Sequence, residues 1–184
     1  VIEVMETLTG TSVNSALWDI TMALGGEALA LGGLAADPKD GAGRIEQALE
    51  SGAAAEWFGR MVTAQGGPAD FVDRWPDRLP AATVIREVPS VGAGHVCRID
   101  GQMLGLAVVR LGGGRQREGD KVNPSVGLSE LAGIGEDIGA GDPLAMVHAA
   151  TEAQADAAIR AVQAAYEMAD TAPKDPDLII KRIA

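Results

Sequence analysis

The residues best suited to chemistry are three consecutive glycines followed by basic residues, in the segment LGGGRQREGDK (111–121). Backbone N–H groups of consecutive glycines can converge on an anion, and Arg115, Arg117 and Lys121 would supply positive charge. The segment lacks the Lys-Ser/Thr ending of a Walker loop and the GxGxxG spacing. Three interpretations stay open. The segment could be a phosphate-binding loop, or a flexible connection that needs positive φ angles and whose bases are solvated or paired with Glu118 and Asp120. It could also be a mobile lid over a site on another domain.

The other reactive residue types occur singly. His95 and His148 have no second histidine beside them, so a zinc site is not indicated. Cys97 alternates with His95 on one face of an expected strand, whereas a Cys–His nucleophile needs its two residues on converging elements. Structural roles are therefore favoured for these three residues. Glu3 lies on an expected helix, where a surface carboxylate is the favoured interpretation.

Hydrophobic spacing and breaker residues predict the elements that carry these residues. Helices are expected over 1–9, 14–31, 41–51, 53–65, part of 69–82 and 151–170. The segment 101–113 could be a helix or a buried strand, and a short helix is favoured because Asp100 can cap it and a double glycine ends it. Strands are expected over 83–88 and 95–99, in a hairpin over 136–149 and in a terminal strand over 177–184. The residues Asn14, Asp100 and Thr151 are the expected helix N-caps, and Gln154 would complete a capping box with Thr151.

The composition changes near Pro80, where helices separated by glycine breaks give way to strands. We expect a helical part over 1–82 and an α+β part over 83–184, with an antiparallel sheet or small sandwich. Trp57 and Phe58 are expected as core anchors of the helical part. The apolar faces of that part, including Val4, Leu8, Leu17 and Leu24, are expected to lack their normal partner, which predicts exposure, self-association or partial disorder.

Length, composition and charge exclude several classes. The chain has 184 residues, 47% of them hydrophobic and 22% charged, which is unlike a disordered protein. Its net charge of −11 disfavours general nucleic-acid binding, and its single cysteine excludes an intrachain disulfide. No apolar stretch suits a membrane span and no secretory signal is visible, so we expect a cytoplasmic protein with no membrane partner. A helix that starts at Val1 without a capping residue predicts a fragment of a longer protein.

Several strings, in order along nearly the whole chain, resemble the thymidine and pyrimidine-nucleoside phosphorylases. They are LTG (8–10), LWDITMAL (17–24), AAEWFGRMVTAQGGPADFVD (54–73), LP (79–80), GLAVVRLGGGRQREGD (105–120), SVGL (125–128) and GDPLAMVHA (141–149). The chain resembles the C-terminal portion of such an enzyme. The resemblance implies that residues 1–82 are the helical remainder of a large α/β domain. It also implies that residues 83–184 form a mixed α/β C-terminal domain whose architecture is barrel-sandwich-like.

The resemblance also implies an activity for the full-length enzyme. Family members cleave thymidine or related pyrimidine nucleosides with inorganic phosphate, giving the free base and (2-deoxy)ribose 1-phosphate. They use phosphate as a co-substrate and no organic cofactor, and they are typically homodimers. The family's phosphate loop and base-binding residues lie in the N-terminal half, and their motifs do not occur in this sequence. We therefore expect no catalytic or substrate-binding residue in this chain, and expect the fragment alone to be inactive.

Two family features fall within the chain. Some members hold a structural monovalent cation with a glutamate that corresponds to Glu3, although the accompanying carbonyl ligands are missing here. The loop containing Gly112, Gly113, Gly114 and Arg115 corresponds to one at the mouth of the active-site cleft, which predicts a cleft-closing loop. The alternative from another class is a non-catalytic interaction or regulatory module that keeps the same fold.

Overall fold

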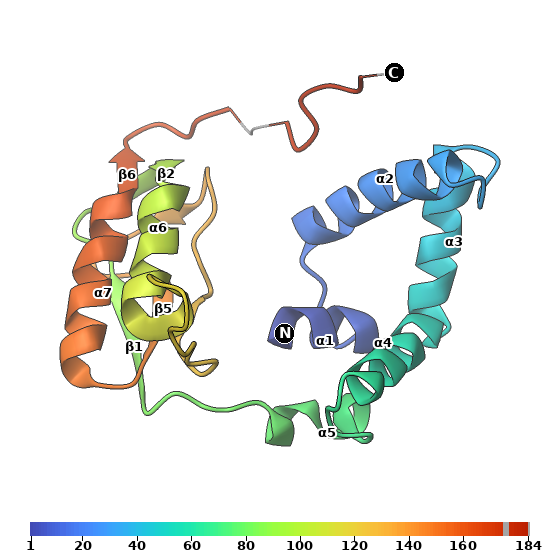
Figure 1. Ribbon diagram of the computed structural model, residues 1–184. Coiled ribbons are helices and arrows are strands. Elements are labelled where there is room, and N and C mark those ends of the chain that lie inside the picture. The colour runs from blue at the N-terminus through green and yellow to red at the C-terminus, as the bar shows by residue number, and fades with distance from the viewer. Residues whose placement is uncertain (175–176, 184) are drawn as a thin grey trace. The chain divides into compact units, whose positions relative to one another are not determined.

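The computed structural model describes residues 1–174 and 177–183, which divide into two compact units (Figure 1). One unit comprises Val1–Leu79 with the described residues of Asp177–Ala184, and the other comprises the described residues of Pro80–Pro176. The division falls between Leu79 and Pro80, close to the change in composition. Which domains of a longer protein these units represent stays a prediction.

The helical unit is built from five α-helices with clear local signals. They are α1 (Ile2–Thr9), α2 (Ser15–Leu31), α3 (Pro38–Glu50), α4 (Ala53–Ala64) and α5 (Phe71–Arg78). The Asn14 side chain accepts a hydrogen bond from the backbone N–H of Leu17 at 3.1 Å, which confirms the expected N-cap of α2. Asp37 caps α3 in the same way, and Pro38 at the first helical position supplies a preset φ.

Helices α2 and α3 pack closely because two glycines meet at their contact. A Cβ added to Gly41 would lie 2.5 Å from the carbonyl oxygen of Gly26, and one added to Gly26 would lie 2.3 Å from that of Pro38. Both distances are far inside van der Waals contact. The absence of side chains at these two positions is therefore what lets the two backbones approach.

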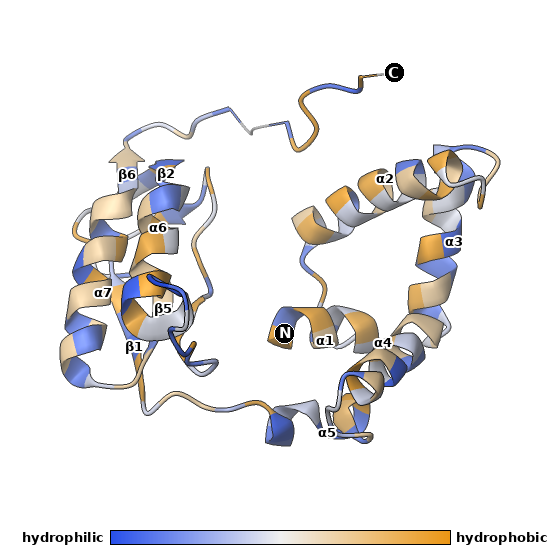
Figure 2. Ribbon diagram, viewed as in Figure 1, coloured by the Kyte–Doolittle hydropathy of each residue, from blue (hydrophilic) through white to orange (hydrophobic). Residues whose placement is uncertain are grey.

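The helical unit buries few hydrophobic side chains. Among its described residues only Met5, Ala55 and Phe71 are buried apolar residues. Hydrophobic residues continue around the turns of α2 (Figure 2), where Leu24 is 59% exposed, and on α1 Val4 is 42% exposed. The predicted exposure is confirmed for these two, while Leu8 and Leu17 are partly buried.

The expectation that Trp57 is a core anchor is wrong. Its side chain is 67% exposed, and the guanidinium of Arg60 lies 4.9 Å from the centroid of its ring. Phe58 is partly buried and packs at a tilt on Phe71, with ring centroids 6.2 Å apart. Helix periodicity alone could not show that the described residues leave the Trp57 face of α4 uncovered.

The second unit is a mixed α+β module with two small antiparallel sheets, as the sequence predicts. The sheet orders are β1-β5-β3 and β4-β2-β6, and the described strands form no closed barrel. The strands are β1 (Val84–Pro89), β2 (Gly94–Ile99), β3 (Gly127–Ser129), β4 (Asp137–Ile138), β5 (Pro143–Ala149) and β6 (Tyr166–Ala169). The helices are α6 (Gly101–Val108), the π-helix η1 (Val109–Gly113) and α7 (Glu152–Ala165).

The core of this unit lies between α7 and strands β1 and β5. Val88, Val147 and Val162 are fully buried there, and α7 also packs beside α6 (Figure 1). At the start of α7, Thr151 accepts a hydrogen bond from the backbone N–H of Gln154 at 3.3 Å, which confirms the expected N-cap. Alternating small and branched side chains in β5 thus cover one apolar face of α7.

Three sequence-based expectations about elements are wrong: a strand pairing, a helix boundary and a terminal strand. Residues 136–149 do not form a hairpin, because β4 pairs with β2 while β5 pairs with β1 and β3. The helix expected over 151–170 ends at Ala165, and the chain continues as β6, which pairs with β2. Residues 177–183 of the expected terminal strand form neither helix nor strand, and Ala184 lies outside the described residues.

Candidate functional site

The glycine-rich loop begins on a helix that is fixed at both ends. Asp100 caps α6 by accepting a hydrogen bond from the backbone N–H of Met103 at 3.0 Å. The helix then widens into η1, where Leu111 is only 3% exposed and belongs to the core of the unit. Single turns of π-helix often occur at functional sites, and this one delivers the chain from a packed helix to an exposed loop.

Backbone conformation accounts for the first of the three glycines, and close packing accounts for the other two. Gly112 has a φ of +96°, which favours glycine, and its carbonyl accepts a hydrogen bond from the backbone N–H of Asn123 at 2.8 Å. A Cβ on Gly113 would lie 2.9 Å from a methyl group of Val108, and one on Gly114 would lie 2.7 Å from a methyl group of Val109. The glycines therefore close the base of the loop, and a role for them in binding phosphate stays a prediction.

The exposed part of the loop, residues 115–121, is held by an acid that binds the backbone. The carboxylate of Asp120 accepts hydrogen bonds from the backbone N–H groups of Gln116 at 3.1 Å and Arg117 at 2.9 Å. Arg115 is exposed, and none of the basic side chains of this loop forms an ion pair within the described residues. The bases of the loop are therefore solvated and not paired with Glu118 or Asp120, which agrees with the solvated form of the flexible-connection interpretation.

The loop is an unusual surface for this chain. Residues 110–121 carry the bases Arg110, Arg115, Arg117 and Lys121 and only two acids, in a protein whose net charge is −11. One of the acids, Asp120, is engaged with backbone N–H groups. The arrangement can attract an anion at its tip by long-range electrostatics.

The two histidines serve separate hydrogen bonds. The Nε2 atom of His148 lies 2.8 Å from the hydroxyl of Ser129, across the β3–β5 pairing, and within the described residues no acid hydrogen-bonds to its other ring nitrogen. The Nδ1 atom of His95 lies 3.3 Å from the carbonyl oxygen of Gly135. The thiol of Cys97 donates to the carbonyl of Glu167 at 3.1 Å. Sequence reasoning missed Ser129, because only the strand register brings it beside His148.

Glu3 lies exposed in the first turn of α1. In the described part of the chain no group of three or more His, Cys, Asp and Glu residues is placed to hold a metal ion. One exposed carboxylate does not by itself fit a cation site. A cation at this position would need most of its oxygen ligands from elsewhere, so the assignment of Glu3 stays a prediction.

The described ionisable groups with shifted pKa values belong to elements other than the loop. A hydrogen bond from Arg78 lowers the pKa of the Asp70 carboxyl, and burial, with a smaller contribution from Glu136, raises the pKa of the Tyr166 hydroxyl. The Tyr166 hydroxyl donates to the carbonyl of Ala132 at 3.1 Å inside the core. These shifts belong to helix and core contacts and do not mark a catalytic acid or base.

Comparison with known proteins assigns this architecture. Residues 95–169 match the family described as the pyrimidine nucleoside phosphorylase C-terminal domain, which spans β2 through β6 and includes the glycine-rich loop. The chain is 50% identical over 171 residues to the thymidine phosphorylases of Burkholderia cenocepacia (strain HI2424) and Burkholderia orbicola (strain MC0-3). The chain belongs to the thymidine and pyrimidine-nucleoside phosphorylase family. It corresponds to the C-terminal portion of these phosphorylases.

The match to these phosphorylases is uneven in length. It covers 93% of this chain but only 39% of each relative. The chain therefore spans about two fifths of the length of the curated phosphorylases that it matches. Among its described residues, every helix is too short or too polar to span a lipid bilayer.

Proposed function

We propose that this chain is the C-terminal part of an enzyme that uses inorganic phosphate to cleave thymidine or a related pyrimidine nucleoside. The products are the free base and (2-deoxy)ribose 1-phosphate. The observation that carries the proposal is the 50% identity to proteins named thymidine phosphorylase over 93% of the chain. Identity at that level, spread over both units, supports a shared enzyme and not merely a shared fold.

The reaction sets requirements that this chain meets only in part. Phosphate attacks the anomeric carbon while the bond to the base breaks, so the site must hold an anion and stabilise negative charge on the leaving pyrimidine. The described residues offer a basic loop, and the two histidines bind a serine hydroxyl and a backbone carbonyl. We infer that the main contacts to phosphate and base come from polypeptide outside this chain, and that the fragment alone is inactive.

The role that we assign to the basic loop is to close over the active-site cleft of the longer enzyme. Its base is braced by buried Leu111 and by the hydrogen bond from Asn123 to Gly112, while Arg115 stands in solvent. A braced base with an exposed cationic tip suits a loop that meets an anionic substrate when domains close. Gly112, Gly113 and Gly114 would set the direction in which that tip leaves η1.

Two further features of the full-length enzyme follow as proposals. We expect the complete enzyme to be a homodimer, in line with the family resemblance. Glu3 would contribute one carboxylate ligand to a structural monovalent cation, completed by oxygen atoms outside this chain.

A chimera tests the proposed function. This chain would replace the matching C-terminal region of the Burkholderia cenocepacia thymidine phosphorylase, and thymidine phosphorolysis would be measured by release of thymine. We expect an active chimera. We expect Arg115→Ala to lower kcat/KM by about tenfold while leaving the melting temperature unchanged, because the residue is exposed. A matched control is Arg44→Ala, an exposed arginine on α3.

The chimera also separates the two classes of function. A folded chimera with no phosphorolysis would favour a non-catalytic interaction module that keeps the family fold. An active chimera in which Arg115→Ala and Arg44→Ala behave alike would keep the enzyme assignment and remove the cleft-closing role of the loop.

A further inference from the structure

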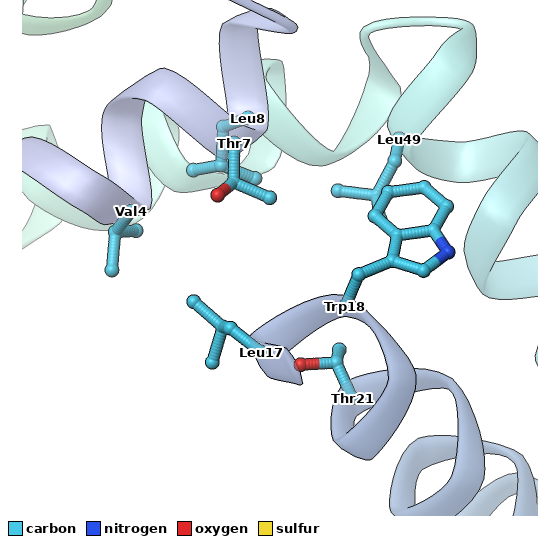
Figure 3. Close-up of a pocket in the computed structure, with 7 residues that line it drawn as sticks. All are labelled: Val4, Thr7, Leu8, Leu17, Trp18, Thr21 and Leu49. Carbon is cyan, nitrogen blue, oxygen red and sulfur yellow. The ribbon is translucent and has the colours of Figure 1, made fainter. Parts of the chain in front are cut away.

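Trp57 has a different environment from the other two tryptophans of the chain. Trp18 is half-buried, and its ring lies beside Leu49 at an apolar cleft lined by α1, α2 and α3 (Figure 3). Trp75 is also half-buried, whereas Trp57 is 67% exposed on α4. Tryptophan is among the residue types that most often anchor protein interfaces, so the surface around Trp57 is a candidate docking surface.

Trp57 belongs to a stripe along the face of α4 that lies opposite its packed face. The packed face carries Ala55, which is buried, and Phe58, which contacts Phe71 of α5. The stripe follows the spacing i, i+4, i+7 and i+11, which is typical of the seam between two helices of a coiled coil. This α4 stripe consists of Ala53, Trp57, Arg60 and Ala64.

We propose that the α4 stripe packs antiparallel against the α4 stripe of a second copy of this chain. A two-fold axis between the helices would place each Trp57 beside the partner's Arg60. It would also place each Ala53 beside the partner's Ala64, where small side chains let the helices approach closely. The inference does not rest on the proposed function, and it names a contact besides any through which the rest of the enzyme dimerises.

The contacts within one chain show that the groups of the stripe attract one another. The guanidinium of Arg60 lies 4.9 Å from the centroid of the Trp57 ring and 2.6 Å from the carboxylate of Glu56. Both contacts are exposed to water, so each contributes little to stability. Between two copies, Arg60 could make the same contacts with the partner's Trp57 and Glu56 while water is excluded, and there the cation–π contact is stronger.

Charge favours a second copy as the occupant of this stripe. Residues 1–82 contain 12 acidic and 5 basic residues, so most pairs of surfaces of two helical units would repel each other. Helix α4 carries one acid and one base, Glu56 and Arg60, on either side of Trp57 in the sequence. An antiparallel copy presents this order in reverse and therefore places a base near each acid. A partner of one charge sign would match only one of the two groups.

Disulfide trapping tests the antiparallel register. Ala53→Cys and Ala64→Cys would be combined in one chain in which Cys97, the native cysteine, is replaced by alanine. The two positions lie about 16 Å apart along α4, too far for a disulfide within one chain, so a bond between them joins two copies. We expect oxidation to give this bond, identified by peptide mass spectrometry, in both the isolated chain and the chimera. Ala64→Cys without the second cysteine is the matched control, because its partner position in the other copy is Ala53.

Charge exchange tests the chemistry of the contact. Sedimentation velocity would give its dissociation constant, and we expect Trp57→Ala and Arg60→Glu each to raise that constant at least about tenfold. Adding Glu56→Arg to Arg60→Glu exchanges the two charges and keeps the stripe self-complementary, so association should return. Arg44→Glu is the control, because it breaks the corresponding pair with Asp40 on α3 and should leave association unchanged.

Each outcome decides the inference. Absence of the disulfide from both samples overturns it. A disulfide in the isolated chain but not in the chimera also overturns it, because the stripe is then covered by the rest of the phosphorylase polypeptide. Equal effects of Arg60→Glu and Arg44→Glu, or no recovery on charge exchange, would show that the contact does not depend on the stripe. A trapped dimer of an inactive chimera supports the contact and counts against the proposed activity.

Discussion

The contact between α2 and α3 makes a sharp prediction, because one helix carries two glycines in opposite environments. Gly41 faces the backbone of Gly26, and an added Cβ would lie 2.5 Å from its carbonyl oxygen and 2.9 Å from its Cα. Gly43, two residues later in α3, has nothing within 4 Å of an added Cβ. Both atoms near Gly41 belong to backbone, which cannot move aside as a side chain could. The two Gly→Ala substitutions should therefore change stability in opposite directions.

The magnitudes follow from two effects. Alanine is favoured over glycine inside a helix by about 1 kcal/mol, and this gain applies at both positions. At Gly41 the clash requires the helices to separate, and overpacking of this kind costs about 1–3 kcal/mol, with the upper end expected for backbone contacts. We expect Gly43→Ala to stabilise the unit by about 1 kcal/mol and Gly41→Ala to destabilise it by about 1–2 kcal/mol.

Tryptophan fluorescence measures this unit selectively. All three tryptophans of the chain, Trp18, Trp57 and Trp75, lie on helices of the helical unit. In thermal unfolding followed by tryptophan emission, we expect the melting temperature to rise by about 4–8 °C in Gly43→Ala. We expect it to fall by at least about 4 °C in Gly41→Ala. If Gly41→Ala is as stable as Gly43→Ala, the close approach of α2 and α3 is wrong.

Three further predictions concern Tyr166 and Asp70. Tyr166→Phe should cost about 1–2 kcal/mol in urea unfolding followed by circular dichroism, because the carbonyl of Ala132 loses its buried donor; an unchanged midpoint would contradict that bond. Tyr166 is the only tyrosine in the chain, and burial raises the pKa of its hydroxyl. The buried neutral hydroxyl therefore contributes fully to folding stability below the unfolded pKa of about 10, and this contribution is lost as the pH rises further. Absorbance at 295 nm should therefore show its ionisation beginning above that of free tyrosine, and a normal titration would refute the buried position. The hydrogen bond from Arg78 lowers the pKa of Asp70, so this pair stabilises the helical unit above the unfolded pKa of about 3.9 and stops doing so as the pH falls through the folded value. The unfolding temperature should consequently fall less between pH 6 and pH 3 in Asp70→Asn than in the unmodified chain, and equal falls would show that the pair contributes nothing.

Local signals carried much of the fold prediction. Asn14, Asp100 and Thr151 each cap the helix expected of them, because a cap depends on residues within one turn. The α+β class and the strands near 84–89 and 94–99 also follow from local alternation. These features need no knowledge of what packs on them.

The errors arose where long-range pairing decides the structure. Residues 136–149 have the composition of a hairpin, yet β4 and β5 join different sheets, and nothing near the turn encodes their partners. Alanine-rich sequence continues past Ala165, but pairing with β2 turns Tyr166–Ala169 into a strand. Trp57 is apolar at a helical spacing, and only the arrangement of neighbouring helices leaves it exposed.

From the sequence, the candidate site could be predicted only as a glycine-rich basic loop. The run Gly112–Gly114 and the basic residues after it are visible in the sequence, whereas the π-helix and the hydrogen bond between Gly112 and Asn123 are not. The contact between Ser129 and His148 depends on the β3–β5 register, so it could not be predicted from the sequence either. The residue types of the loop could therefore be predicted from the sequence, whereas its contacts and backbone conformation depend on tertiary structure.

The central claim is that the groups that grip phosphate and pyrimidine lie on polypeptide outside these 184 residues. The most direct measurement is thymidine phosphorolysis by the purified chain alone, at saturating phosphate, beside the chimera at equal concentration. Our account predicts thymine release by the chimera and none above the enzyme-free rate by the isolated chain. Steady turnover by the isolated chain, lost on Arg115→Ala, would contradict it.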